Sequence, residues 1–171
     1  MIGDLDSLLE SGKFADVTLV VGDSELKAHR AILASRSNTF DSMFESGESR
    51  YELADIDLEV AEHTLRYIYT GLVPPLGTYG REIFVAADKY QLDSLKMLAE
   101  DSLAGSLTVE NVIHVLVLAD QHSASKLKQI ALAFITKNAR PVMATEAWEQ
   151  MGVERPLLLM QLYKDLVQVK K

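Results

Sequence analysis

The stretch at residues 27–44, KAHRAILASRSNTFDSMF, holds the residues of this chain that most resemble a hydrolytic site. His29 is followed six and eight residues later by Ser35 and Ser37, and a histidine that takes the proton of a serine hydroxyl is the basis of acyl transfer. Neither an oxyanion-hole signature nor an orienting carboxylate accompanies them nearby. We therefore expect no catalytic residue here, and interpret the stretch as a strand end that leads into a buried helix.

The histidines do not have the spacing of a metal site. No two of them are four residues apart, HExxH is absent, and the chain has no cysteine. His114 and His122 could share one face of a helix, but a third ligand is missing. The glycine motifs of phosphate-binding loops and nucleophile elbows are absent as well. The sequence predicts no metal, no cofactor and no enzymatic activity.

Composition excludes several further classes of protein. The chain has 171 residues, 48% of them hydrophobic and 25% charged, which is typical of a globular domain. Its formal net charge of −8 would be repelled by a nucleic-acid backbone. The longest apolar run, at residues 112–119, is too short for a membrane helix, and the acidic N-terminus does not resemble a signal peptide. The lack of cysteine is compatible with a reducing compartment.

Asp16 and Arg30 are the charged residues that a simple fold would bring together. Alternating apolar residues on both sides of Gly22 and Asp23 predict a β-hairpin. Because Asp16 precedes its first strand and Arg30 follows its second, both would lie at the same end, within reach of an ion pair. Such a pair either serves specificity when half-buried or contributes little when exposed.

The N-terminal segment carries an apolar stripe. Met1, Leu5, Leu8 and Leu9 follow the spacing of one helix face, on a segment too short to be stable alone. We expect it to dock either on its own domain or on another subunit, and the sequence does not choose between the two.

The rest of the chain is mixed up to residue 77 and helical after it. We expect a helical stretch at 31–44 with a cap at Ser37 or Asn38, a strand at 51–56, and a helix ended by Gly71. Two later segments match at an offset of 32 residues, 86–103 and 118–135, and predict two similar helical hairpins. Thr108 with Asn111 resembles a helix start, and Pro156 begins a final helix that runs to about Val167.

Several motifs, in this order, resemble the BTB/POZ family, in particular its speckle-type POZ protein branch. They are FADVTLVV, LKAHRAILASRS, FDSMF, YIYTG, AADKYQLDSLK and VENVIHVLVLADQHSASKLK, and they extend over nearly the whole chain. The resemblance implies an α+β fold, a small sheet flanked by helices, at residues 1–106. It also implies a post-BTB helical extension of the 3-box or BACK type at residues 107–171.

The resemblance further implies a nuclear or cytoplasmic, non-catalytic homodimer in the ubiquitin pathway. It would bind the N-terminal region of cullin-3, while a separate MATH domain, absent from these residues, would hold the substrate. The chain would then be either a fragment or the user of another recognition surface. The residues that match the family's dimer interface are Met1, Leu5, Leu8, Leu9, Asp16, Arg30 and Ile32.

For the cullin contact, the family's hydrophobic-x-Glu motif has no match in the short loop after residue 44. Met43, Phe44 and Glu45 fit the pattern on the preceding helix and are therefore the contact candidates, together with the helices at 109–135. The alternative is a dimerisation module of a transcriptional regulator that recruits a corepressor.

Overall fold

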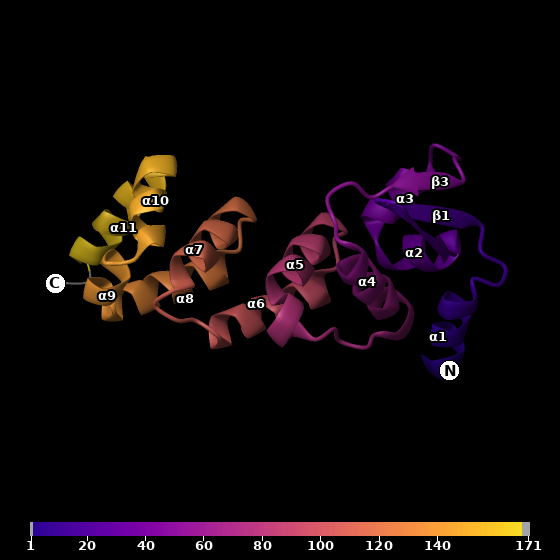
Figure 1. Ribbon diagram of the computed structural model, residues 1–171, viewed down its shortest axis with the longest axis horizontal. Helices are drawn as coiled ribbons and strands as arrows, with labels where there is room; N and C mark the ends of the chain where they lie inside the picture. The colour runs from indigo at the N-terminus through magenta and orange to yellow at the C-terminus, as the bar shows by residue number, and fades with distance from the viewer. Residues whose placement is uncertain (1, 169–171) are drawn as a thin grey trace. The chain divides into compact units, whose positions relative to one another are not determined.

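The computed structural model describes residues 2–168, with side chains described for residues 3–164. The chain divides into two compact units, one up to Ala99 and one from Glu100 onward. Figure 1 labels the elements of both. The first unit contains α1 (Ile2–Ser11), β1 (Val17–Val21), β2 (Ser24–Ala28), α2 (Arg30–Arg36), α3 (Asn38–Phe44), β3 (Arg50–Glu52), α4 (Leu58–Thr70), α5 (Leu76–Lys89) and the start of α6 (Asp93–Gly105).

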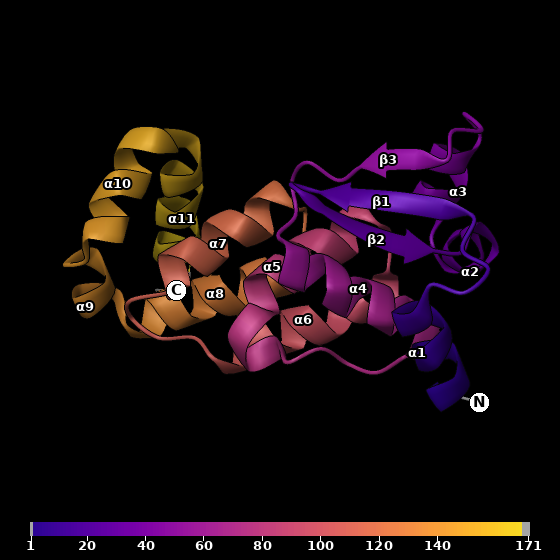
Figure 2. The ribbon, with the colours of Figure 1, turned by 45° about the vertical axis from the view of Figure 1, so that its right-hand side comes forward.

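The sheet of the first unit has the strand order β2-β1-β3 (Figure 2). The predicted hairpin is confirmed: β1 and β2 are antiparallel, with Val21 opposite Ser24 and Gly22 in the turn at a φ of 57°. Strand β3 is parallel to β1 and covers only three residues. The predicted strand at 51–56 was thus too long, because the chain turns after Leu53 to begin α4.

The core of this unit lies between the sheet and the helices. Leu19 of β1 and Leu33 of α2 are fully buried, and the ring of Phe40 stacks on that of Tyr90 with centroids 4.7 Å apart. The predicted cap at Ser37 is confirmed, since its hydroxyl accepts the backbone N–H of Phe40 at 3.2 Å. The same hydroxyl donates to the carbonyl of Tyr90 at 2.6 Å, which ties α3 to the end of α5.

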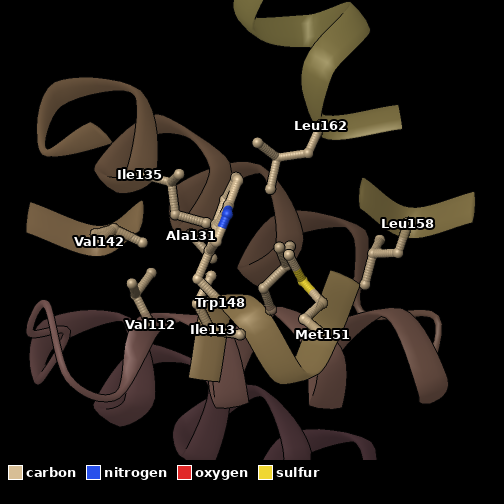
Figure 3. Packing of buried hydrophobic residues seen from close by; sticks show 10 residues of the cluster. Val112, Ile113, Ala131, Ile135, Val142, Trp148, Met151, Leu158 and Leu162 are labelled. Carbon is tan, nitrogen blue, oxygen red and sulfur yellow. The ribbon is translucent and has the colours of Figure 1, made fainter. Parts of the chain in front are cut away.

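The second unit is helical throughout its described residues. It continues α6 and contains α7 (Val112–Gln121), α8 (Ser125–Lys137), α9 (Ala139–Met143), α10 (Glu146–Glu154) and α11 (Pro156–Gln168). Figure 3 shows Trp148 and Met151 of α10 among apolar side chains from α7, α8 and α11. Leu162 of α11 is 1% exposed, so the final helix, which begins at the predicted Pro156, contributes to this core.

The two predicted helical hairpins share the geometry of their turns at the predicted offset of 32 residues. Lys96 Nζ donates to Asp88 at 2.6 Å in the first hairpin, and Lys128 Nζ donates to Asp120 at 2.7 Å in the second. In both, the turn contains a residue with a φ of 53°. The lysine thus links the second helix of each hairpin to the last turn of the first, so the two Leu-Lys motifs do the same structural work.

Candidate protein-interaction surface

Helix α1 packs against α4 of its own chain (Figure 2). Arg66 of α4 donates to Asp6 at 2.8 Å and to Glu10 at 2.7 Å, and these carboxylates raise the pKa of its guanidinium. The polar side of α1 is therefore anchored by ion pairs, while Leu5 and Leu8 stay partly exposed. Met1 lies outside the described residues. A further contact of the leucines with a second subunit stays a prediction.

Asp16 and Arg30 do meet, but through the backbone. The carboxylate of Asp16 accepts the backbone N–H of Arg30 at 2.8 Å, and the guanidinium donates to the backbone carbonyl of Asp16 at 3.4 Å. The carboxylate therefore satisfies an amide at the start of α2, where His29 gives no side-chain cap. The predicted ion pair is corrected in this respect: the hairpin brings the residues together, and the helix start uses the carboxylate.

The guanidinium of Arg30 is directed toward the end of α3 and the loop after it. It donates to the carbonyl of Phe44 at 3.3 Å and to the carbonyl of Glu48. It also lies 5.2 Å from the ring centroid of Phe44 and 5.8 Å from that of Tyr51. Arg30 thus fixes the segment that follows the candidate cullin contacts.

The three candidate cullin contacts lie at the C-terminal end of α3. Met43 and Phe44 are half-buried, and Glu45, which follows the helix, is exposed. The rings of Phe44 and Tyr51 lie 5.3 Å apart, and the hydroxyl of Tyr51 is 2.9 Å from that of Ser46. The arrangement is a short apolar ridge with a carboxylate at its end, a surface suited to binding another protein.

His29 is held in a hydrogen-bond network that does not involve either candidate serine. Its Nδ1 lies 2.8 Å from the Tyr69 hydroxyl, which also accepts the backbone N–H of His29 at 2.8 Å. Its Nε2 lies 2.8 Å from the carbonyl of Lys13. Burial raises the pKa of Tyr69 to about 12. The histidine joins the segment before β1 to α4, a structural role.

Ile32 of α2 is half-buried, and its contact with a second subunit stays a prediction. Within the described residues there is no group of three or more potential metal ligands, and no helix is long and apolar enough to cross a membrane. Sequence reasoning missed Arg66, Tyr69 and Tyr51. Arg66 and Tyr69 are joined to partners 40 or more residues away, which no local pattern spans, whereas Tyr51 contacts Phe44 and Ser46 seven and five residues before it.

The comparisons with known proteins cover most of the chain. The BTB/POZ domain matches residues 5–107, and the BACK domain described as BPM/SPOP matches residues 111–163. Among solved structures, the BTB domain of zebrafish PATZ1 is similar, with 28% sequence identity and a TM-score of 0.57. That match covers 62% of this chain and 90% of the zebrafish domain.

Proposed function

Because the chain belongs to the BTB/POZ family and also carries a BACK domain of the BPM/SPOP type, we propose that it is a homodimeric, non-catalytic adaptor that binds the N-terminal region of cullin-3. The observation that carries the proposal is the presence of both domains in one chain, in this order. The substrate of the resulting ubiquitin ligase would be bound by a domain outside these residues.

The end of α3 is the proposed cullin contact. The half-buried Met43 and Phe44 offer apolar area, and Arg30 holds the adjoining loop through two carbonyl groups. Apolar side chains at a preorganised position are typical of interface hot spots, since little ordering remains to be done on binding. We propose the contact on the helix itself, because the family's usual motif has no match in the loop after residue 44.

Binding of the purified chain to the N-terminal region of cullin-3, measured by calorimetry, tests this proposal. We expect Met43→Lys to weaken binding at least tenfold, because a charge would replace apolar contact area. Met143→Lys, at a position 42% exposed on α9, is the matched control and should bind normally. Lack of association of the unmodified dimer, or equal binding by both variants, would argue against the proposed contact.

The dimer is tested separately by light scattering. The double substitution Leu5→Asp with Leu8→Asp should give monomer or aggregate, because two carboxylates would have to be buried in the seam. Gly3→Asp with Ser7→Asp adds the same charge at exposed positions of α1 and should leave the dimer intact. A two-subunit mass for both double variants would contradict an interface at these leucines.

A further inference from the structure

A groove of about 390 Å³ lies beside β2, between this strand and helices α1 and α4. Three consecutive residues of β2, Glu25, Leu26 and Lys27, line it. Side chains of consecutive residues point to opposite faces of a sheet. A groove lined by all three therefore runs along the edge of the strand and not over one face.

The hydrogen bonds of β1 show which backbone groups of β2 face this groove. Thr18 and Val20 of β1 bond to β3, since Thr18 donates to Ser49 and Val20 accepts from Leu53. The alternate residues of β1 therefore face β2, and their opposite residues there are Ser24, Leu26 and Ala28. The N–H and C=O groups of Glu25 consequently point away from the sheet, and no described residue bonds to them.

The groove has an apolar base and, beside it, the exposed carboxylate of Glu62. Leu9 and Leu26 are partly exposed in it, and Leu65 lies buried beneath. Its carboxylates are those of Glu10, Glu25 and Glu62, of which Glu10 is bound by Arg66 and Glu25 by both Lys27 and Arg50. The cations are already engaged: Arg66 with Asp6 and Glu10, and Lys27 with Thr18 and Glu25. Glu62 is exposed and has no ion-pair partner among the described residues.

We propose that the free edge of β2 binds an extended, basic peptide segment of a partner protein, which adds to the sheet beside β2. Its backbone would pair with Glu25, its apolar side chains would contact Leu26 and Leu9, and a lysine or arginine would pair with Glu62. Strand addition of this kind takes affinity from main-chain hydrogen bonds and specificity from alternate side chains. Charge complementarity selects a basic occupant, and the site is independent of the end of α3.

Gly12 limits the groove at one end. Its φ is +58°, and a Cβ added there would lie 3.0 Å from the Cβ of Lys27. The connection between α1 and β1 thus passes close to the end of the edge strand. The bound segment is therefore short, and pairs with the part of β2 near Glu25.

Two-dimensional NMR of the isotopically labelled chain tests the proposal. The probe is a blocked heptapeptide in which lysine alternates with valine, and its acidic twin has glutamate in place of lysine. We expect the basic peptide to shift the amide signals of Glu25 and Leu26 and the methyl signals of Leu9, and the acidic twin to leave them unchanged. Methylation of one alternate set of peptide amides should abolish the shifts, because those amides would pair with β2.

Variants of the protein give the second arm of the test. Glu25→Pro removes an outward N–H without touching the bonds to β1, and should weaken peptide binding about three- to tenfold. Glu52→Pro is the matched control, because Glu52 is likewise directed to the outer edge of β3. Glu62→Lys should weaken binding, whereas Glu154→Lys, with the same charge change on α10, should not.

Three results would overturn the proposal. The first is that the basic and acidic peptides shift the signals equally. The second is that the peptide with methylated amides shifts them as much as the unmethylated peptide does. This second comparison uses the unmodified protein, so it remains valid even if the proline variant does not fold. The third is a change in the NMR signals of the groove residues with protein concentration, together with release of the peptide as the dimer forms. In that case the second copy of the chain covers the edge.

Discussion

Replacing Asp16 and Arg30 singly and together distinguishes the contact seen in the structure from an ion pair. In Asp16→Ala, the first amide of α2 loses its acceptor, which costs about 1 kcal/mol for an exposed helix cap. In Arg30→Ala, two carbonyls lose a charged donor and two rings lose a cation, together about 2 kcal/mol. The backbone N–H of residue 30 remains, so Asp16 keeps its partner in that variant.

The two losses should therefore add, to about 3 kcal/mol in the double variant, with a coupling below about 0.5 kcal/mol. A half-buried ion pair predicts the opposite order: Asp16→Ala alone would be worse than the double variant, because it leaves one charge unpaired. Urea unfolding at a fixed chain concentration measures all four free energies, since the stability of the proposed dimer would depend on concentration. A double variant more stable than Asp16→Ala would refute the backbone contact.

Four further predictions concern the first unit. Tyr69→Phe should cost about 1–3 kcal/mol in urea unfolding, whereas Tyr90→Phe, whose buried hydroxyl has no partner among the described residues, should change stability by less than about 0.5 kcal/mol. Burial raises the pKa of both phenols to about 12, above the usual 10. Because the folded state keeps these protons to a higher pH than the unfolded state does, stability should fall between pH 10 and pH 12. Each phenylalanine variant should show a smaller fall. Ser37→Ala should lower the melting temperature by several degrees through loss of a buried cap, while the exposed Ser35→Ala should barely change it. Gly71→Ala should lower the free energy of unfolding in urea by about 1 kcal/mol, because a φ of 73° disfavours any residue with a Cβ.

Local patterns were sufficient for the elements that local interactions determine. The hairpin at Gly22, the helix end at Gly71 and the cap at Ser37 each depend on residues within four positions of one another. The repeat was also readable, because an aspartate and a lysine recur at fixed places in both hairpins. Here the same residues that carry the sequence pattern make the contact.

The candidate site was harder to predict, because its contacts join distant parts of the chain. The leucine stripe of α1 was visible, but the anchor at Arg66 lies 60 residues from Asp6. The free edge of β2 follows only once β3 is known to pair with the other side of β1. For Asp16 and Arg30, the hairpin determined which residues meet, while the unsatisfied amide of α2 determined which atoms bond.

Arg30 links the expected dimer interface to the proposed cullin contact, which were predicted from the sequence as separate surfaces. It begins α2, beside the residues expected at the dimer seam, yet its guanidinium bonds the carbonyls of Phe44 and Glu48 next to the proposed cullin contact. The two carbonyls belong to residues four positions apart, at the end of α3 and in the loop after it. Arg30 therefore holds the segment that follows the candidate contacts Met43 and Phe44. The loop and the cation that holds it therefore form one feature of the proposed binding surface.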